Sequence, residues 1–138
     1  MRRMGKSGRV TTGAIVLTFA CGTASVAQDV TGLWANQPEA CDTIFVKHGN
    51  RIEFSPKADF HGSGFIIEGD VIRGKMATCK IRKKVRKGDM VTITAACATA
   101  VMVADSIFKF RTDEPDAIVR LAAGSSALDT KYVRCSSK

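Results

Sequence analysis

The chain contains little of the material from which catalytic and metal-binding sites are usually built. It has one tryptophan, one tyrosine, two histidines and three prolines among 138 residues. Two histidines leave little for a histidine-rich metal site, and the cysteine spacings match no CxxC-type zinc pattern. We therefore expect no catalytic residues, no metal and no cofactor. No amphipathic helix longer than two turns is visible beyond the first 27 residues, which argues against a helical fold.

Acidic residues are absent from the first 28 positions, and that segment has the pattern of a secretory signal peptide. Four basic residues lie in the first ten positions, an apolar stretch runs from Gly13 to Ala20, and small residues lead to Ala27. The stretch is too short for a permanent membrane-spanning helix. We expect a cleavable signal helix over residues 1–27 and one domain over residues 28–138, in the periplasm or outside the cell. A lipoprotein anchored at Cys21 is disfavoured, because the preceding residues fit a lipobox poorly.

Much of the net charge of +8 belongs to this leader. Without its four basic residues, 17 basic and 13 acidic residues remain, and the net charge falls to +4. Such a modest excess indicates no nucleic-acid partner. We expect a monomer with no integral membrane span once the leader is removed.

Short strand-forming runs alternate with Gly, Asn, Asp and Pro, which is typical of an all-β barrel or sandwich. We expect strands over Thr31–Ala35, Thr43–Lys47, Arg51–Phe54, Gly64–Glu68, Val71–Arg73, Ala77–Val85, Met90–Cys97, Ser106–Arg111, Ala117–Leu121 and Thr130–Cys135. Some short neighbours should merge. The sequence therefore predicts an all-β fold, a small antiparallel barrel of about eight strands.

Four cysteines follow the leader, and an even number in a small exported domain predicts two disulfides. The clearest local structure is a hairpin with a three-residue tip at Lys87-Gly88-Asp89. Its register places Cys79 directly opposite Cys97, near enough for a disulfide. Elimination then pairs Cys41 with Cys135, which would tie the first strands to the last.

The same hairpin carries a dense basic stretch, with no acid between Asp70 and Asp89. The register predicts a row of cations on one strand face, about 7 Å apart. The residues expected to bind an anionic partner are Arg73, Lys75, Lys80, Arg82, Lys84 and Arg86. Such a row would attract acidic lipid headgroups, lipopolysaccharide phosphates, acidic polysaccharide or an acidic protein face. A solubilising strand face is the plainer alternative, and the absence of interleaved aromatic residues disfavours nucleic acid.

Two other segments need an interpretation. The apolar run Ala98–Ala104 predicts a core-facing strand, with an exposed patch for a partner as the alternative. Ser63 lies between glycines and follows His61 by two residues. Neighbours in an extended loop point apart, whereas a nucleophile needs its base close by, so we interpret this segment as a flexible loop.

The two ends of the mature chain carry short motifs, Thr31-Gly32-Leu33-Trp34 and Tyr132-Val133-Arg134-Cys135. A Gly-x-Trp on the first strand with an Arg on the last resembles lipocalins and related small barrels. The resemblance implies that Arg134 packs across Trp34 and helps to close the barrel, a physically sensible cation–π contact. With Cys41 following, the pattern also resembles periplasmic protease inhibitors and uncharacterised exported barrel proteins of Gram-negative bacteria.

These features predict a non-catalytic exported binding protein. Its partner would be a protein or an anionic component of the cell envelope. The specific function that the resemblance implies is inhibition of a protease or a lysozyme. One alternative is a small-molecule carrier with a cavity inside the barrel. The other, a hydrolase using Ser63, is disfavoured.

Overall fold

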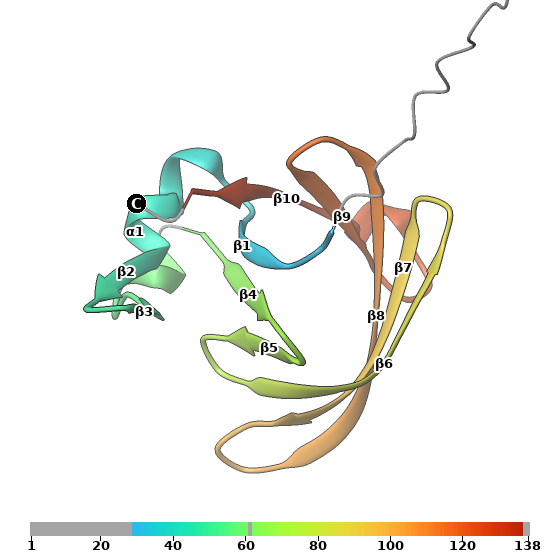
Figure 1. Cartoon of the computed structure of the whole chain (residues 1–138), viewed down its shortest axis with the longest axis horizontal. Helices are drawn as coiled ribbons and strands as arrows, with labels where there is room; N and C mark the ends of the chain where they lie inside the picture. Colours follow the sequence, from blue (N-terminus) through green and yellow to red (C-terminus); the bar gives the residue numbers. More distant parts are fainter. Residues whose placement is uncertain (1–28, 61, 137–138) are drawn as a thin grey trace, which may run out of the picture.

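Ten strands form along the strand-forming runs of the sequence, and eight of them close into an antiparallel barrel (Figure 1). The computed structural model describes residues 29–60 and 62–136, so the predicted leader lies outside the described residues. The barrel strands are β1 (Gly32–Ala35), β4 (Gly64–Glu68), β5 (Val71–Gly74), β6 (Thr78–Lys87), β7 (Met90–Ala98), β8 (Val103–Glu114), β9 (Ala117–Leu121) and β10 (Thr130–Cys135). Their order is β1-β10-β9-β8-β7-β6-β5-β4, and β4 pairs back to β1. The predicted barrel is confirmed.

Tight turns join the strands at one end of the barrel. These are Gly69-Asp70, Gly88-Asp89 and Pro115-Asp116, each of two residues. Gly69, Gly88 and Asp116 have φ values of 57°, 60° and 55°, a region that glycine and aspartate tolerate better than most residues. We call this the closed end. The β5–β6, β7–β8 and β9–β10 connections lie at the opposite, open end.

The β6–β7 hairpin follows the predicted register only near its base. Cys79 pairs with Cys97 and Ile81 with Ala95, as expected. A register shift between Ile81 and Lys83 then moves every later pair by one position. The tip is consequently Gly88-Asp89, and the prediction of a three-residue tip was wrong. A bulge of this kind leaves one residue unpaired and reverses the faces of those beyond it.

The connection from β1 to β4 forms a small unit against the outer wall of the barrel. It contains two 3-10 turns, η1 (Pro38–Ala40) and η2 (Ala58–Phe60), the short helix α1 (Cys41–Ile44), and a hairpin of β2 (Phe45–His48) and β3 (Arg51–Phe54). The start of the predicted strand over 43–47 is therefore helical. Ile44 and Phe45 pack with Leu33 and Ile66 in a second core, outside the barrel.

Both predicted disulfides are present, Cys79–Cys97 and Cys41–Cys135. Because Cys41 lies in α1, its bridge fastens the outer unit to β10. Barrel closure itself comes from the pairing of β1 with β4 and β10.

The main core fills the barrel interior. Val91, Ile93 and Ala95 alternate along β7 with no exposed surface, and Phe110 faces them from β8. The run Ala98–Ala104, by contrast, is exposed at every position. The prediction that it faces the core was wrong, because this run forms the end of β7, the turn after it and the start of β8, beyond the packed interior. In the described ranges, every helix is too short or too polar to cross a bilayer.

Candidate functional site

Trp34 and Arg134 seal the closed end. Trp34 is fully buried, and its Nε1 donates to the Val30 carbonyl at 2.8 Å. The Arg134 guanidinium lies 4.3 Å from the Trp34 ring centre, which confirms the predicted cation–π contact. Its Nη1 and Nη2 donate to the carbonyls of Thr31 and Asp29, at 2.5 and 2.7 Å. These bonds hold the chain entry across the barrel base.

Gly32 has a specific reason to be glycine. Its φ is +136°, and a Cβ placed there would lie 2.6 Å from Arg134 Nη1. In the Gly-x-Trp motif, Trp34 therefore supplies the indole that fills the barrel base, and Gly32 leaves the space that the Arg134 guanidinium occupies.

The predicted anionic-partner residues are each engaged within the protein. Five bond to carboxylates, in the pairs Arg73–Glu68, Lys75–Asp59, Lys80–Asp70, Arg82–Asp105 and Lys84–Asp29, whereas Arg86 donates to the Thr112 hydroxyl and the Gly88 carbonyl. Acids distant in sequence thus neutralise most of the basic stretch. The expectation of a continuous row of cations on one face of β6 was also wrong, because the bulge between Ile81 and Lys83 interrupts the alternation of faces. Whether these residues bind an anionic partner stays a prediction.

Beyond the bulge, Lys84 and Arg86 lie on the inward-facing side of β6. They pair with Ile93 and Val91, two core residues, so they reach over the closed end. Lys84 Nζ donates to Asp29 Oδ1 at 3.2 Å. Burial raises the pKa of Asp29, but hydrogen bonds from Thr31 and Lys84 outweigh it and hold this pKa below its usual 3.8. The hydrogen bond from Lys80 likewise lowers the pKa of Asp70.

The open end contains a cavity of about 510 Å³, which we call the cup. Its aromatic lining comes from Phe65, Phe108, Phe110 and Tyr132, and the Cys79–Cys97 disulfide, Thr99 and Met102 complete much of its wall. Phe65 and Tyr132 meet edge to face, with ring centres 4.8 Å apart. The cup is open to solvent at the β5–β6 and β7–β8 turns. No motif in the sequence predicts this cavity, because its walls come from seven strands.

Arg120 is the one charged residue among those that line the cup. Its guanidinium carbon lies 5.2 Å from the centre of the Phe108 ring, and the residue is exposed. Among the described residues, no carboxylate lies within ion-pair distance of it. Hydroxyls of Ser63, Ser106 and Tyr132 add hydrogen-bonding groups. The arrangement suits an apolar body with a polar or anionic end.

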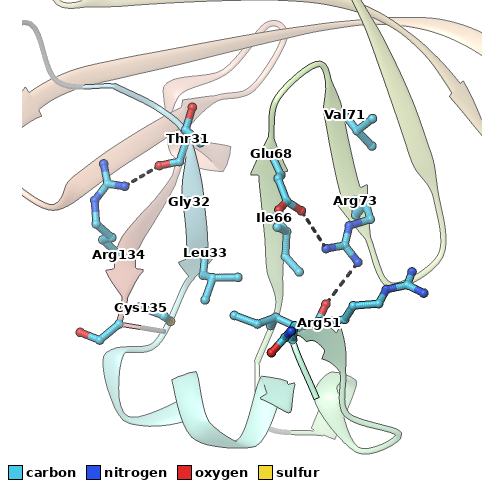
Figure 2. Close-up of a pocket in the computed structure, with 13 residues that line it drawn as sticks. Thr31, Gly32, Leu33, Arg51, Ile66, Glu68, Val71, Arg73, Arg134 and Cys135 are labelled. Carbon is cyan, nitrogen blue, oxygen red and sulfur yellow. Dashed lines mark hydrogen bonds and ion pairs between the residues drawn. The ribbon is translucent and has the colours of Figure 1, made fainter. Parts of the chain in front are cut away.

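A second hollow, the groove, has a volume of about 1010 Å³ and lies between the β2–β3 hairpin and the outer barrel wall. Figure 2 shows Arg73 reaching from β5 toward Glu68 and toward the hairpin. Its Nη2 lies 3.4 Å from Glu68 Oε2, and its Nη1 donates to the Ile52 carbonyl at 3.2 Å. Arg51 and Arg134 also line the groove, over the apolar surface of Leu33 and Ile66.

The serine that suggested a hydrolase lies at the edge of the cup. The backbone N–H of Ser63 donates to Asn36 Oδ1 at 2.8 Å. His61 lies outside the described residues. Within the described ranges, no three His, Cys, Asp or Glu side chains gather as a metal site would require.

Comparison with protein-family models, curated proteins and solved structures finds no match for this chain, so no activity is transferred to it from a relative.

Proposed function

We propose that this chain is an exported, non-catalytic binding protein whose cup takes a small, largely apolar molecule. The observation that carries the proposal is the contrast along the barrel axis. Trp34 and Arg134 fill the closed end, whereas the open end leaves about 510 Å³ lined by four aromatic side chains. Cavities of this size at the mouth of a β-barrel are common ligand sites.

The polar groups of the cup favour binding over chemistry. Hydroxyls and one guanidinium donate and accept hydrogen bonds, which orients a ligand. Arg120 stands at the lip over Phe108, where it would pair with an anionic group while the apolar body lies on the rings. This favours the carrier alternative among the functions that the sequence predicts.

Two naphthalene probes test the cup: uncharged N-phenyl-1-naphthylamine and its anionic relative, anilinonaphthalene sulfonate. Ala104 lines the cup, so Ala104→Trp should fill it and weaken both probes by at least about tenfold. Ala123→Trp, on an exposed connection outside the cup, should change neither. Fluorescence titration measures both affinities.

The charge of the ligand is tested separately. Arg120→Gln should weaken the anionic probe by about three- to tenfold and leave the uncharged probe unchanged. Equal binding of both probes to the unmodified protein, Ala104→Trp and Ala123→Trp would refute the cup as the site.

The second candidate is a protein or anionic partner at the groove. Arg51, Arg73 and Arg134 surround it, with one acid, Glu68, among its lining residues. If the groove binds polyanions, Arg51→Ser should elute from heparin at lower salt than the unmodified protein. Lys47→Ser, on the same hairpin but outside the groove, is the matched control; equal shifts would reject the groove.

A further inference from the structure

The open end carries an unusual concentration of exposed apolar side chains. The described residues include six large hydrophobic side chains that are exposed. Three of these lie on the β5–β6 and β7–β8 turns, and a fourth, Val103, begins β8 directly after its turn. We call these four the rim: Met76, Val101, Met102 and Val103, exposed by 77, 90, 58 and 74%. The other two are Ile107, farther along β8, and Leu128, in η3 (Ser126–Leu128) of the β9–β10 connection, exposed by 66 and 68%.

The two rim turns are neighbours in the sheet. The β5–β6 turn ends directly before Thr78, Thr78 pairs with Ala98, and Ala98 pairs with Val103. In Figure 1 the β7–β8 turn is the lowest point of the molecule, below the β5–β6 turn. The rim residues of the two turns therefore share one end of the barrel.

Several backbone N–H groups of the rim turns have hydrogen-bond acceptors within the protein. The N–H groups of Val101 and Met102 donate to Thr99 Oγ1 at 3.3 and 3.2 Å, and the Thr99 N–H donates to the Met102 carbonyl at 2.9 Å. In the adjacent turn the Gly74 N–H donates to the Ala77 carbonyl. Peptide groups that enter lipid must find such partners within the protein, because lipid offers none.

The charges around the rim complement lipid headgroups. Residues 75–77 and 99–102 include one charged residue, Lys75, which pairs with Asp59 of η2. Arg120 adds a positive charge at the cup lip, over Phe108. The turns of the closed end each contain an aspartate, Asp70, Asp89 or Asp116. An anionic surface would attract Arg120, the cation at the open end for which the described residues offer no carboxylate partner.

We propose that the rim seats this protein on an anionic lipid bilayer, with the cup opening toward the membrane. Convex turns that carry aliphatic and methionine side chains suit insertion among lipid chains. They lack the Trp, Tyr and Arg anchors that dominate protein–protein contacts. Thr99 and Met102 belong to both rim turn and cup, so a seated rim would offer an apolar route from bilayer to cavity.

Vesicle flotation tests the proposal on the purified protein. It should float with vesicles of phosphatidylcholine mixed with phosphatidylglycerol, and less with phosphatidylcholine alone. Val101→Asp and Met76→Asp should each lower the partition coefficient at least about tenfold, since a carboxylate replaces an apolar side chain at the lipid boundary. Ile107→Asp, a similarly exposed position within β8 and outside the open-end connections, is the matched control and should float like the unmodified protein.

Separate readouts keep this proposal apart from the cup. Neither Val101 nor Met76 lines the cup, so both variants should still bind the uncharged naphthalene probe. Circular dichroism should show an unchanged fold. No flotation of the unmodified protein, or equal losses in the rim variants and the control, would overturn the proposal. So would a dimer in sedimentation velocity that Val101→Asp abolishes, because the rim would then bind a second copy of this chain.

Discussion

The closed end of this barrel is filled by packed side chains, whereas the open end contains a cavity. At the closed end, Trp34 is fully buried and Arg134 bonds to two carbonyls and to Asp116. At the open end, the interior is left as a cavity and apolar side chains protrude into solvent. A barrel sealed firmly at one end can leave the other end incompletely packed. If the cup binds a ligand as we propose, stability and binding belong to separate ends, and substitutions can test this division.

The largest expected effect distinguishes the two disulfides. Cys41–Cys135 spans 94 residues and Cys79–Cys97 spans 18. In the chain-entropy description, removing the longer bridge with Cys41→Ala and Cys135→Ala should cost about 4 to 5 kcal/mol, and removing the shorter one about 3 kcal/mol. Urea denaturation gives both values. The shorter bridge lines the cup, so its loss should also weaken probe binding, whereas a reversed pattern would contradict the division between the ends.

The second effect compares one aromatic residue from each end. Trp34→Ala empties the sealed base and should cost about 3 to 5 kcal/mol of unfolding free energy. Phe108 is only half-buried on the cup wall, so Phe108→Ala should cost about 1 to 2 kcal/mol. Because Trp34 is the sole tryptophan, unfolding is best followed by circular dichroism. Equal costs would mean that the open end is packed as firmly as the closed end.

Two glycines give a smaller and sharper contrast. Gly32→Ala forces a Cβ to within 2.6 Å of Arg134 Nη1 at a φ of +136°, and should cost about 1 to 3 kcal/mol. At the open end, a Cβ on Gly74 would meet nothing nearer than the Ala77 carbonyl at 3.6 Å. Gly74→Ala should therefore change stability by less than about 1 kcal/mol. Thermal unfolding of the two variants measures the difference; a neutral Gly32→Ala would show that Arg134 moves aside easily.

The smallest effect depends on pH. Because hydrogen bonds from Thr31 and Lys84 hold the pKa of Asp29 below 3.8 in the folded protein, its ionised carboxylate stabilises the fold above that pH. This stability is lost as pH falls through the lowered value. Asp29→Asn should cost about 0.5 kcal/mol at neutral pH, as an exposed pair would, and the difference from the unmodified protein should vanish in acid. A difference that persists in acid would assign the effect to something other than ionisation.

Features encoded locally or by short motifs could be predicted from the sequence. The strand over Gly64–Glu68 and both disulfides agree with expectation, as does the Trp34–Arg134 contact. The β6 bulge could not be foreseen, because simple alternation fits either register until the strand is fitted to β5 and β7. Hydrophobicity alone also misplaced Ala98–Ala104, since an apolar run reads the same in a core strand and in an exposed turn. The cup escaped prediction because it is bounded by residues far apart in sequence.

The bonds of Arg134 also set the order in which this molecule can form. Its hydrogen bonds to Thr31 and Asp29 join residues 103 and 105 positions apart in the sequence. Cys41 likewise cannot form its disulfide until Cys135 has been synthesised. Synthesis therefore delivers the partner of the first strand almost last, and the ring cannot close on a partial chain. Contacts so distant in sequence slow folding, so an emerging chain stays open until its final strand arrives. Such delay is compatible with transport as an extended polypeptide, followed by closure and oxidation at the destination.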